Sequence, residues 1–338
     1  MTNNLTDDFG SLVLQFSEIK LTILTQNTRT LQYLHDQFDI FQIQCTDFST
    51  ELILKISDIT KSSEEAFSQQ RLSFFDPDDS TIEAHISFQQ PISFGLEIPF
   101  EHPKCDRLCF RIVRALILRY YHAHGFPFLH ASAVTFENKA VLILGSKKAG
   151  KTTSALCLST YGPFSPLAND KLFLSEYQNK IIVRALPMTF GIRAGTLNTF
   201  PKIRRLAQEA NQLDGESNEG LGDKVARLSI NSISNTLKKK VTPNPQLALV
   251  LYPQFIPDAT QHEFSPIAPI EAISVFNENR LTKFNEICNY QKEAEALWKN
   301  RSQNDVAKLS DGAINAFQWK YNPKTLASSI DDILLKIL

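Results

Sequence analysis

The sequence predicts an α/β protein whose core is built around a phosphate-loop motif, with a β-rich module before the core and a mostly helical tail after it. Residues 1–104 alternate apolar and polar side chains in several short segments, which is typical of half-buried strands. Residues 139–159 read as a buried strand, a glycine-containing loop and a helix, in that order. The chain has 338 residues, so two compact units or one core with a large extension are both compatible with its length.

The N-terminal module is predicted to cover residues 1–104 and to be mainly β. Its alternating segments are residues 51–56, 81–88 and 92–98, and residues 76–80 read Asp-Pro-Asp-Asp-Ser, which is a strong turn signal. Such a module suits recognition of a partner or substrate, because an exposed strand edge can pair with an extended peptide.

The P-loop core is predicted to cover residues 105–265. Apolar residues at helical spacing run from Asp106 to Gly125, where glycine suits a helix end. Residues 126–136 then read as a strand, and a turn connects it to the strand 139–144 that enters the loop.

The rest of the core is predicted to alternate short strands with one long polar loop. Residues 172–174 and 181–183 form a predicted hairpin, and residues 247–251 read as a buried strand. Residues 207–224 combine three glycines with acidic side chains, which favours a mobile loop that acts as a lid. The tail, residues 266–338, is predicted to be mostly helical, with a short aromatic strand near residues 317–319.

Residues 145–152 match the phosphate-binding pattern G-x-x-x-x-G-K-[S/T] at every required position. In that motif the loop amides and the N-terminus of the following helix point at phosphate oxygens. Lys151 is expected to reach the β- and γ-phosphates, and the Thr152 hydroxyl to complete the oxygen shell of a Mg²⁺ ion. Lys147 and Lys148 either clamp a polyphosphate or are simply solvated. The predicted nucleotide-binding residues are Gly145, Ser146, Lys147, Lys148, Ala149, Gly150, Lys151, Thr152 and Thr153.

The composition argues against several classes of partner and site. The 35 Lys and Arg residues nearly balance the 36 Asp and Glu residues, so we expect neither nucleic acid nor a membrane surface to be the partner. The five cysteines have neither a metal-ligand spacing nor the density of a disulfide scaffold. Because the first ten residues are polar and acidic and no apolar run is long enough to cross a bilayer, we expect a cytoplasmic protein.

Three motifs in combination carry a resemblance to a known family. His130-Ala-Ser-Ala precedes the phosphate loop, and Asn169-Asp170 follows it at the end of a later strand. With these motifs the chain resembles the HPr kinase/phosphorylase-like proteins over roughly residues 105–255, and the arrangement is similar to the nucleotide core of phosphoenolpyruvate carboxykinases. Residues 193–197 and 252–253 also look similar to divergent members of the group, some of which sit in peptide-natural-product pathways.

The resemblance implies a kinase that uses Mg²⁺ and ATP or another nucleoside triphosphate. The phosphate acceptor would be a hydroxyl, on Ser or Thr of a peptide or protein or on a small metabolite. Thr152 and Asp170 would hold the metal, and Asp170, His130 and Lys151 would be the catalytic residues. Asn169 and Arg193 are candidate contacts to substrate or phosphate. Related kinases are often symmetric rings, so a homo-oligomer is compatible with the resemblance.

Two positions depart from the family pattern. The family usually has two adjacent aspartates where this chain has Asn169-Asp170, and an amide can position a group but cannot take a proton. The family's phosphorylases carry an acidic residue where this chain has Thr153, which favours kinase over phosphorylase activity. Two alternatives stay open: an NTPase or nucleotide-gated switch without a dedicated acceptor, and a nucleotide-binding module whose catalytic pair has decayed. Taken alone, His130 is compatible with a structural histidine, and Arg193 with a surface ion pair.

Overall fold

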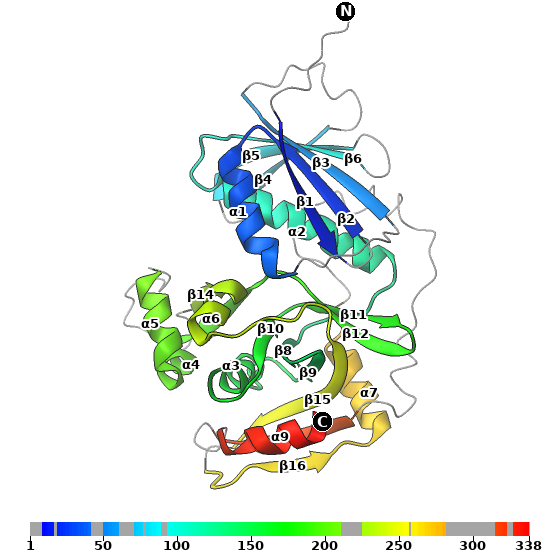
Figure 1. Cartoon of the computed structure of the whole chain (residues 1–338), viewed down its shortest axis with the longest axis vertical. Helices are drawn as coiled ribbons and strands as arrows, with labels where there is room; N and C mark the ends of the chain where they lie inside the picture. The colour runs from blue at the N-terminus through cyan, green and yellow to red at the C-terminus, as the bar shows by residue number, and fades with distance from the viewer. Residues whose placement is uncertain are drawn as a thin grey trace, which may run out of the picture. The chain divides into compact units, whose positions relative to one another are not determined.

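The structure of the protein is a computed structural model with a mixed α/β fold. It describes residues 9–16, 19–41, 50–60, 71–76, 79–88, 93–210, 225–256, 258–281, 315–322 and 327–337. The chain divides after His124 into two compact units, each with its own main sheet (Figure 1). The predicted three-part division, with boundaries at residues 104/105 and 265/266, stays a prediction.

The first unit contains a six-stranded sheet in the order β1-β2-β3-β6-β5-β4. Strands β2, β3 and β6 run parallel to one another, and the other neighbouring pairs are antiparallel. Its strands are β1 (Gly10–Phe16), β2 (Ile19–Thr25), β3 (Thr50–Asp58), β4 (Arg71–Asp76), β5 (Asp79–Phe88) and β6 (Ser93–Ile98). The predicted strands 51–56 and 81–88 are therefore confirmed, and the predicted strand 92–98 is confirmed from Ser93, since residue 92 lies outside the described residues. The predicted turn at 76–80 includes Pro77 and Asp78, which lie outside the described residues.

The described helices of this unit, α1 (Thr28–Phe38) and α2 (Cys105–Ala123), pack against each other, and a 3₁₀ turn, η1 (Asp39–Phe41), follows α1. The Asn27 side chain caps α1 by accepting a hydrogen bond from the Thr30 backbone N–H. Asp106, in the first turn of α2, accepts a hydrogen bond from the Thr30 hydroxyl at 2.6 Å and pairs with Arg29 at 2.9 Å. Helix α2 matches the helix predicted from Asp106 to Gly125.

The second unit is built on nine described strands, of which seven follow the order β10-β8-β9-β15-β12-β11-β7. Strand β15 runs parallel to β9 on one side and to β17 on the other, and β17 also pairs with β16. The strands are β7 (Phe128–Leu129), β8 (Ser132–Phe136), β9 (Lys139–Ile143), β10 (Ser165–Ala168), β11 (Leu172–Tyr177), β12 (Lys180–Ala185), β15 (Gln246–Phe255), β16 (Glu263–Pro266) and β17 (Asn315–Tyr321). Beside this sheet, β13 (Thr189–Arg193) and β14 (Val225–Ser229) form a separate two-stranded antiparallel ribbon.

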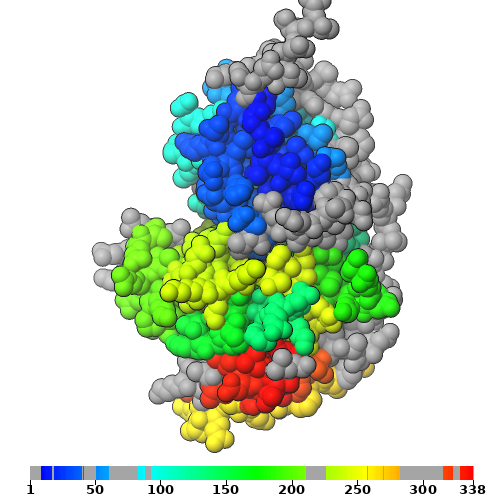
Figure 2. Space-filling model, in the orientation of Figure 1, coloured from blue at the N-terminus to red at the C-terminus, as the bar shows by residue number. Residues whose placement is uncertain are grey.

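Six α-helices accompany these strands in the described part of the second unit. They are α3 (Lys151–Tyr161), α4 (Ala194–Thr199), α5 (Pro201–Glu209), α6 (Ile230–Leu237), α7 (Pro269–Glu278) and α9 (Ile330–Ile337), and the 3₁₀ turn η4 (Ala327–Ser329) precedes α9. Figure 2 shows the red C-terminal helix packed directly against the yellow segment that contains β16. Their contact includes a polar pair, since His262 Nε2 and Asp332 Oδ2 lie 2.6 Å apart.

The loop at residues 144–150 is held at both ends by buried elements. Strand β9 ends in the run Ala140 to Ile143, of which every residue is fully buried, and β8 and β15 pair with it on either side. Helix α3 buries four consecutive residues, Ala155 to Leu158, so its apolar surface is enclosed on several sides. The predicted order of strand, loop and helix is confirmed, and the helix begins at Lys151, one residue before its predicted start.

Several other sequence predictions differ from the structure in detail. The predicted strand 126–136 is interrupted at His130 and Ala131, which separate β7 from β8. The predicted hairpin is confirmed as β11 and β12, and Gln178 and Asn179 turn between them with positive φ angles of 49° and 58°. In the predicted lid at 207–224, the first residues belong to α5 and residues 211–224 lie outside the described part. The aromatic strand near residues 317–319 is confirmed as β17, which joins the main sheet.

Candidate functional site

The glycine-rich loop wraps around the amino group of Lys151. Its Nζ atom donates hydrogen bonds to the Gly145 carbonyl at 2.7 Å and to the Ser146 carbonyl at 3.1 Å. The loop bends sharply, with positive φ angles at Gly145, Lys148 and Gly150 of 146°, 73° and 95°. Burial lowers the pKa of Lys151, and the negative charge of Asp170 partly offsets this effect. The cation is therefore held inside the loop, at the position that the motif assigns to bound phosphate.

Gly150 is the loop position that tolerates a side chain least. A Cβ atom there would press against the hydroxyl of Tyr321, which is buried at the end of β17 and also accepts a hydrogen bond from Ser154 at 3.2 Å. The residue also has φ of +95°, a conformation that L residues rarely adopt. Close packing and backbone geometry therefore both require glycine.

We expect Gly150→Ala to lower the free energy of unfolding by about 1–3 kcal/mol, because strain of each kind costs amounts of this order. Adding Tyr321→Phe, which removes the hydroxyl, should restore part of the loss but not the part due to φ. Gly195→Ala is the matched control, since a Cβ at Gly195 meets nothing within 4 Å and alanine favours the helix α4. Urea unfolding of the four proteins measures these effects, and equal stability of Gly150→Ala and wild type would contradict this account.

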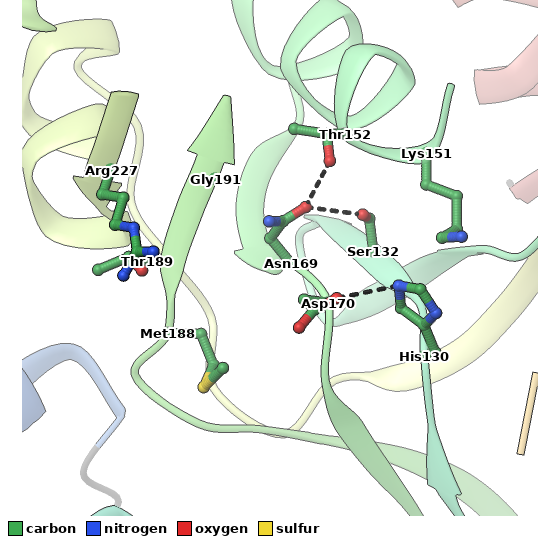
Figure 3. A pocket seen from close by; sticks show the side chains of 10 residues that line it. All are labelled: His130, Ser132, Lys151, Thr152, Asn169, Asp170, Met188, Thr189, Gly191 and Arg227. Carbon is green, nitrogen blue, oxygen red and sulfur yellow. Dashed lines mark hydrogen bonds and ion pairs between the residues drawn. The ribbon is translucent and has the colours of Figure 1, made fainter. Parts of the chain in front are cut away.

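Asn169 connects the helix α3 to the strand β8 through a single amide oxygen. Its Oδ1 atom accepts hydrogen bonds from the Thr152 hydroxyl at 2.9 Å and from the Ser132 hydroxyl at 3.0 Å (Figure 3). Asn169 is only 5% exposed, so these bonds are shielded from water. Both hydroxyl protons are directed at Asn169, which leaves the hydroxyl oxygens with lone pairs for another partner. Asn169 therefore fixes the direction of the Thr152 hydroxyl.

Asp170 and His130 form the second polar pair of the site. His130 Nε2 lies 2.9 Å from Asp170 Oδ1, and Asp170 adopts a left-handed backbone with φ of 77° (Figure 3). The hydrogen bond from His130 lowers the pKa of Asp170, and the charges of Lys171 and Lys151 act in the same direction against partial burial. Asp170 is therefore a carboxylate at neutral pH. Non-glycine residues in such a backbone conformation cluster at functional sites.

The lowered pKa of Asp170 predicts how stability depends on pH. Because the folded pKa lies below the unfolded value of about 3.9, the ionised carboxylate stabilises the fold above that value, and this contribution is lost as the pH falls through the folded pKa. We expect Asp170→Asn to melt at a lower temperature than wild type at pH 7, with the gap closing below about pH 4. The effect is small, since the side chain is 50% exposed. Thermal melts of both proteins between about pH 3 and pH 7 test this, and a gap that widened on acidification would contradict it.

Asn279 links the start of the loop to His130 by accepting a hydrogen bond from a backbone N–H of each. Its Oδ1 accepts a hydrogen bond from the Gly145 N–H at 3.3 Å, and its carbonyl accepts one from the His130 N–H at 2.8 Å. Its own side chain is fixed by a bond to the Val275 carbonyl at 2.7 Å, and the residue is 6% exposed. The end of helix α7 therefore sets the spacing between the start of the loop and His130.

Two adjoining cavities open around these residues. The loop-side cavity, of about 590 Å³, is lined by loop and α3 residues 147–153 together with Arg193 and Thr196. The ribbon-side cavity, of about 320 Å³, is lined by Ser132, Asn169, Met188, Thr189 and Arg227. Both cavities share one wall, which is made by His130, Lys151, Thr152, Asp170 and Gly191.

The loop-side cavity is rich in cations that have no protein counter-ion. Lys147, Lys148 and Arg193 line it, and within the described stretches none of them has a hydrogen-bond or ion-pair partner. Exposed cations elsewhere in the described residues are of both kinds, since Arg205 pairs with Glu209 at 2.8 Å whereas Lys180 has no such partner. Among the residues that the structure describes, Arg193 has no partner for the surface ion pair that its sequence also allowed. Unpaired cations around a concave surface favour an anionic ligand.

The structure brings together most of the residues predicted from the sequence. Ala149 to Thr153, His130, Asp170 and Arg193 line the loop-side cavity, while Gly145 and Ser146 contribute carbonyls to Lys151. Sequence reasoning missed Ser132, although it lies within the quoted His-Ala-Ser-Ala motif, and it missed Met188, Thr189, Gly191, Thr196, Arg227 and Asn279. Thr196 lies in the quoted Arg193 segment and exchanges a hydrogen bond with Thr153 at 3.0 Å, whereas no sequence signal points to Arg227 or Asn279.

The oxygen donors of the shared wall suit Mg²⁺ bound together with phosphates. In the described part of the chain, no group of three or more His, Cys, Asp or Glu side chains could hold a metal ion alone. Mg²⁺ commonly takes one or two carboxylates and completes its shell with water and substrate phosphates. The Asp170 carboxylate and the Thr152 hydroxyl are hard oxygen donors of this kind, and the Asn169 amide oxygen accepts a hydrogen bond from the Thr152 hydroxyl.

Comparison with known proteins finds distant likenesses among solved structures. No protein-family model matches the chain, and no curated protein matches it. Among solved structures, the Hpr(Ser) kinase/phosphatase from Coxiella burnetii is similar at 13% sequence identity with a TM-score of 0.29, over 62% of this chain and 97% of that one. None of the helices in the described stretches is both long and apolar enough to cross a bilayer.

Proposed function

We propose that this protein is a Mg²⁺-dependent phosphotransferase that moves a phosphoryl group from ATP, or another nucleoside triphosphate, to a hydroxyl. The observation that carries the proposal is the loop-side cavity, where three unpaired cations and the buried Lys151 face a wall that ends in Asp170 and His130. A cradle for polyphosphate and a carboxylate next to it are the parts that phosphoryl transfer requires.

Each residue has a role in this proposal. The loop amides and Lys151 hold the β- and γ-phosphates, while Lys147, Lys148 and Arg193 balance the charge of the triphosphate. Thr152 and Asp170 would hold Mg²⁺, which would neutralise charge on the phosphates. These assignments rest on the chemistry of the side chains and on their common cavity.

The reaction places Asp170 beside the attacking oxygen. The acceptor oxygen bonds to the γ-phosphorus while the bond from phosphorus to the β–γ bridging oxygen breaks, and the departing electron pair leaves with the nucleoside diphosphate. The hydroxyl proton passes to the Asp170 carboxylate, which the hydrogen bond from His130 holds in place. The acceptor is a hydroxyl of a peptide or protein Ser or Thr, or of a small metabolite.

A thermal-shift panel tests the donor half of the proposal. The purified protein is melted with ATP, GTP and pyrophosphate, each with and without Mg²⁺, because a ligand that binds only the folded state raises the melting temperature. We expect a Mg²⁺-dependent rise with at least one nucleoside triphosphate. Absence of any shift at millimolar ligand would refute nucleotide binding and with it the proposed function.

A second candidate function is nucleotide binding without phosphoryl transfer. Asn169 favours it, because its amide oxygen is already engaged by two hydroxyls and the residue offers no carboxylate to the site. The two functions differ in turnover once binding is established. Production of nucleoside diphosphate that depends on an added hydroxyl compound supports the kinase, acceptor-independent production indicates an NTPase, and binding without any production indicates a binding module.

A further inference from the structure

The ribbon of β13 and β14 forms the wall of the site that lies across from Lys151 (Figure 3). Gly191 pairs with Arg227 in its antiparallel register, so the two residues lie on the same face of the ribbon. Thr189 and Arg193 alternate with buried neighbours on β13 and belong to this face as well. The ribbon thus presents one arginine to each cavity: Arg193 lines only the loop-side cavity, and Arg227 lines only the ribbon-side cavity.

The position of the shared wall determines what each cavity can hold. Bound phosphates occupy the loop-side cavity in the proposed function, which leaves the ribbon-side cavity as the second approach to Asp170. Attack on phosphorus is roughly in line with the leaving oxygen, so an acceptor must enter opposite the nucleotide. Figure 3 shows Lys151 and Arg227 on opposite sides of the pocket, with Asn169 and Asp170 between them. The ribbon-side cavity is therefore the place for the acceptor.

Arg227 gives the ribbon-side cavity an unsatisfied positive charge. It is exposed, and it has no hydrogen-bond or ion-pair partner in the parts of the chain that the structure describes. The other basic side chains on the cavity wall are engaged, Lys151 with loop carbonyls and His130 with Asp170. Its planar guanidinium group matches the paired oxygens of a carboxylate or a phosphate.

We propose that the phosphate acceptor is an anionic hydroxyl compound, whose carboxylate or phosphate binds Arg227 while its hydroxyl meets Asp170. This inference rests on the proposed phosphotransferase function and narrows its substrate class. A cavity of about 320 Å³ accommodates a small metabolite or the terminal residue of a peptide, not a folded surface. Met188, 8% exposed on the cavity wall, supplies an apolar contact for the carbon skeleton.

The experiment measures binding of paired anionic and neutral probes to the full chain, saturated with Mg²⁺ and the non-hydrolysable analogue AMP-PNP. The probes are glycerate and glycerol 3-phosphate against glycerol, and the peptide Ala-Ala-Ser with a free against an amidated C-terminus. We expect at least one anionic probe to bind at least about tenfold more tightly than its neutral counterpart, by calorimetry. Tight binding of glycerate or glycerol 3-phosphate would indicate that the acceptor is a free metabolite. Tight binding of the peptide with the free C-terminus would indicate that the acceptor is the end of a peptide chain.

Two matched arginine variants separate the cavities. Arg227→Gln is expected to weaken the anionic probe by about tenfold or more and to leave AMP-PNP affinity unchanged. Arg193→Gln should weaken AMP-PNP binding and leave affinity for the anionic probe unchanged. The probe affinity of Arg227→Lys should fall between those of wild type and Arg227→Gln, because lysine keeps the charge but not the planar guanidinium group. Circular dichroism and melting temperature confirm that each variant is folded.

Three results would each overturn the inference while leaving the proposed function intact. In the first, neutral probes bind as tightly as anionic ones, and in the second, no probe binds to the nucleotide-bound protein. In the third, Arg227→Gln loses AMP-PNP affinity as Arg193→Gln does. The third result would show that Arg227 contributes to nucleotide binding and not to acceptor binding. Failure of wild type to bind any nucleoside triphosphate with Mg²⁺ would instead refute the phosphotransferase itself.

Discussion

Replacing Lys151 with alanine is expected to reduce Mg²⁺-nucleotide affinity by about 30- to 5,000-fold, which corresponds to roughly 2–5 kcal/mol for removing one partner of a buried charge pair. Lys151 is 8% exposed and already confined by the Gly145 and Ser146 carbonyls. A bound phosphate would meet a cation that needs little reorganisation, so most of the interaction energy is available for binding. Calorimetric titration of the triphosphate that shifts the melting temperature measures the loss.

The control for this prediction is a neighbouring cation of the same loop. Lys147→Ala removes one positive charge from an exposed position, where solvent screens the interaction, and should lower affinity by less than about tenfold. Lys151→Ala also removes two hydrogen bonds to the loop, so the melting temperature of the nucleotide-free variant must be compared with wild type. If the folded Lys151→Ala protein bound nucleotide as tightly as wild type, the loop would not be the phosphate site.

The parts of the site that sequence could predict are those fixed by local chain geometry. The strand before the loop and the helix after it follow from the apolar run at residues 139–144 and from the glycine and lysine positions of the motif. Asn169 and Asp170 follow directly after a buried strand, β10, which places them at a sheet end. Local patterns of this kind predict the structure well, because the local preference of these segments agrees with their place in the fold.

The parts that sequence could not predict depend on contacts between distant segments. Asn279 meets Gly145 across 134 positions of sequence, and nothing in the C-terminal end of α7 distinguishes this asparagine from a helix-capping residue. Arg227 enters the site only because β14 pairs with β13. The break at His130 between β7 and β8 likewise depends on tertiary contact, since the His130 N–H is bound by Asn279 and not by a neighbouring strand. Pairing register and long-range hydrogen bonds are not encoded in local periodicity.

Replacing Asp170 with asparagine is expected to lower turnover by about 10²- to 10⁴-fold, the usual contribution of a positioned acid–base group, with nucleotide affinity changed by less than about tenfold. Asparagine is preferred to alanine here, because Asp170 has φ of 77° and asparagine tolerates this conformation whereas alanine would add backbone strain. The amide keeps the shape of the carboxylate but can neither accept the hydroxyl proton nor supply a full charge to Mg²⁺. The Mg²⁺ concentration for half-maximal activity should therefore rise as well.

Glu137→Gln is the matched control for this change. Glu137 is an exposed acid with a positive φ of 52° in the turn between β8 and β9, so its substitution removes the same charge from a similar backbone conformation outside both cavities. Turnover of this control should equal that of wild type. Steady-state rates and nucleotide affinities of the three proteins separate chemistry from binding. A rate for Asp170→Asn equal to wild type would remove Asp170 from the reaction and leave His130, its hydrogen-bond partner, as the remaining candidate base on the shared wall.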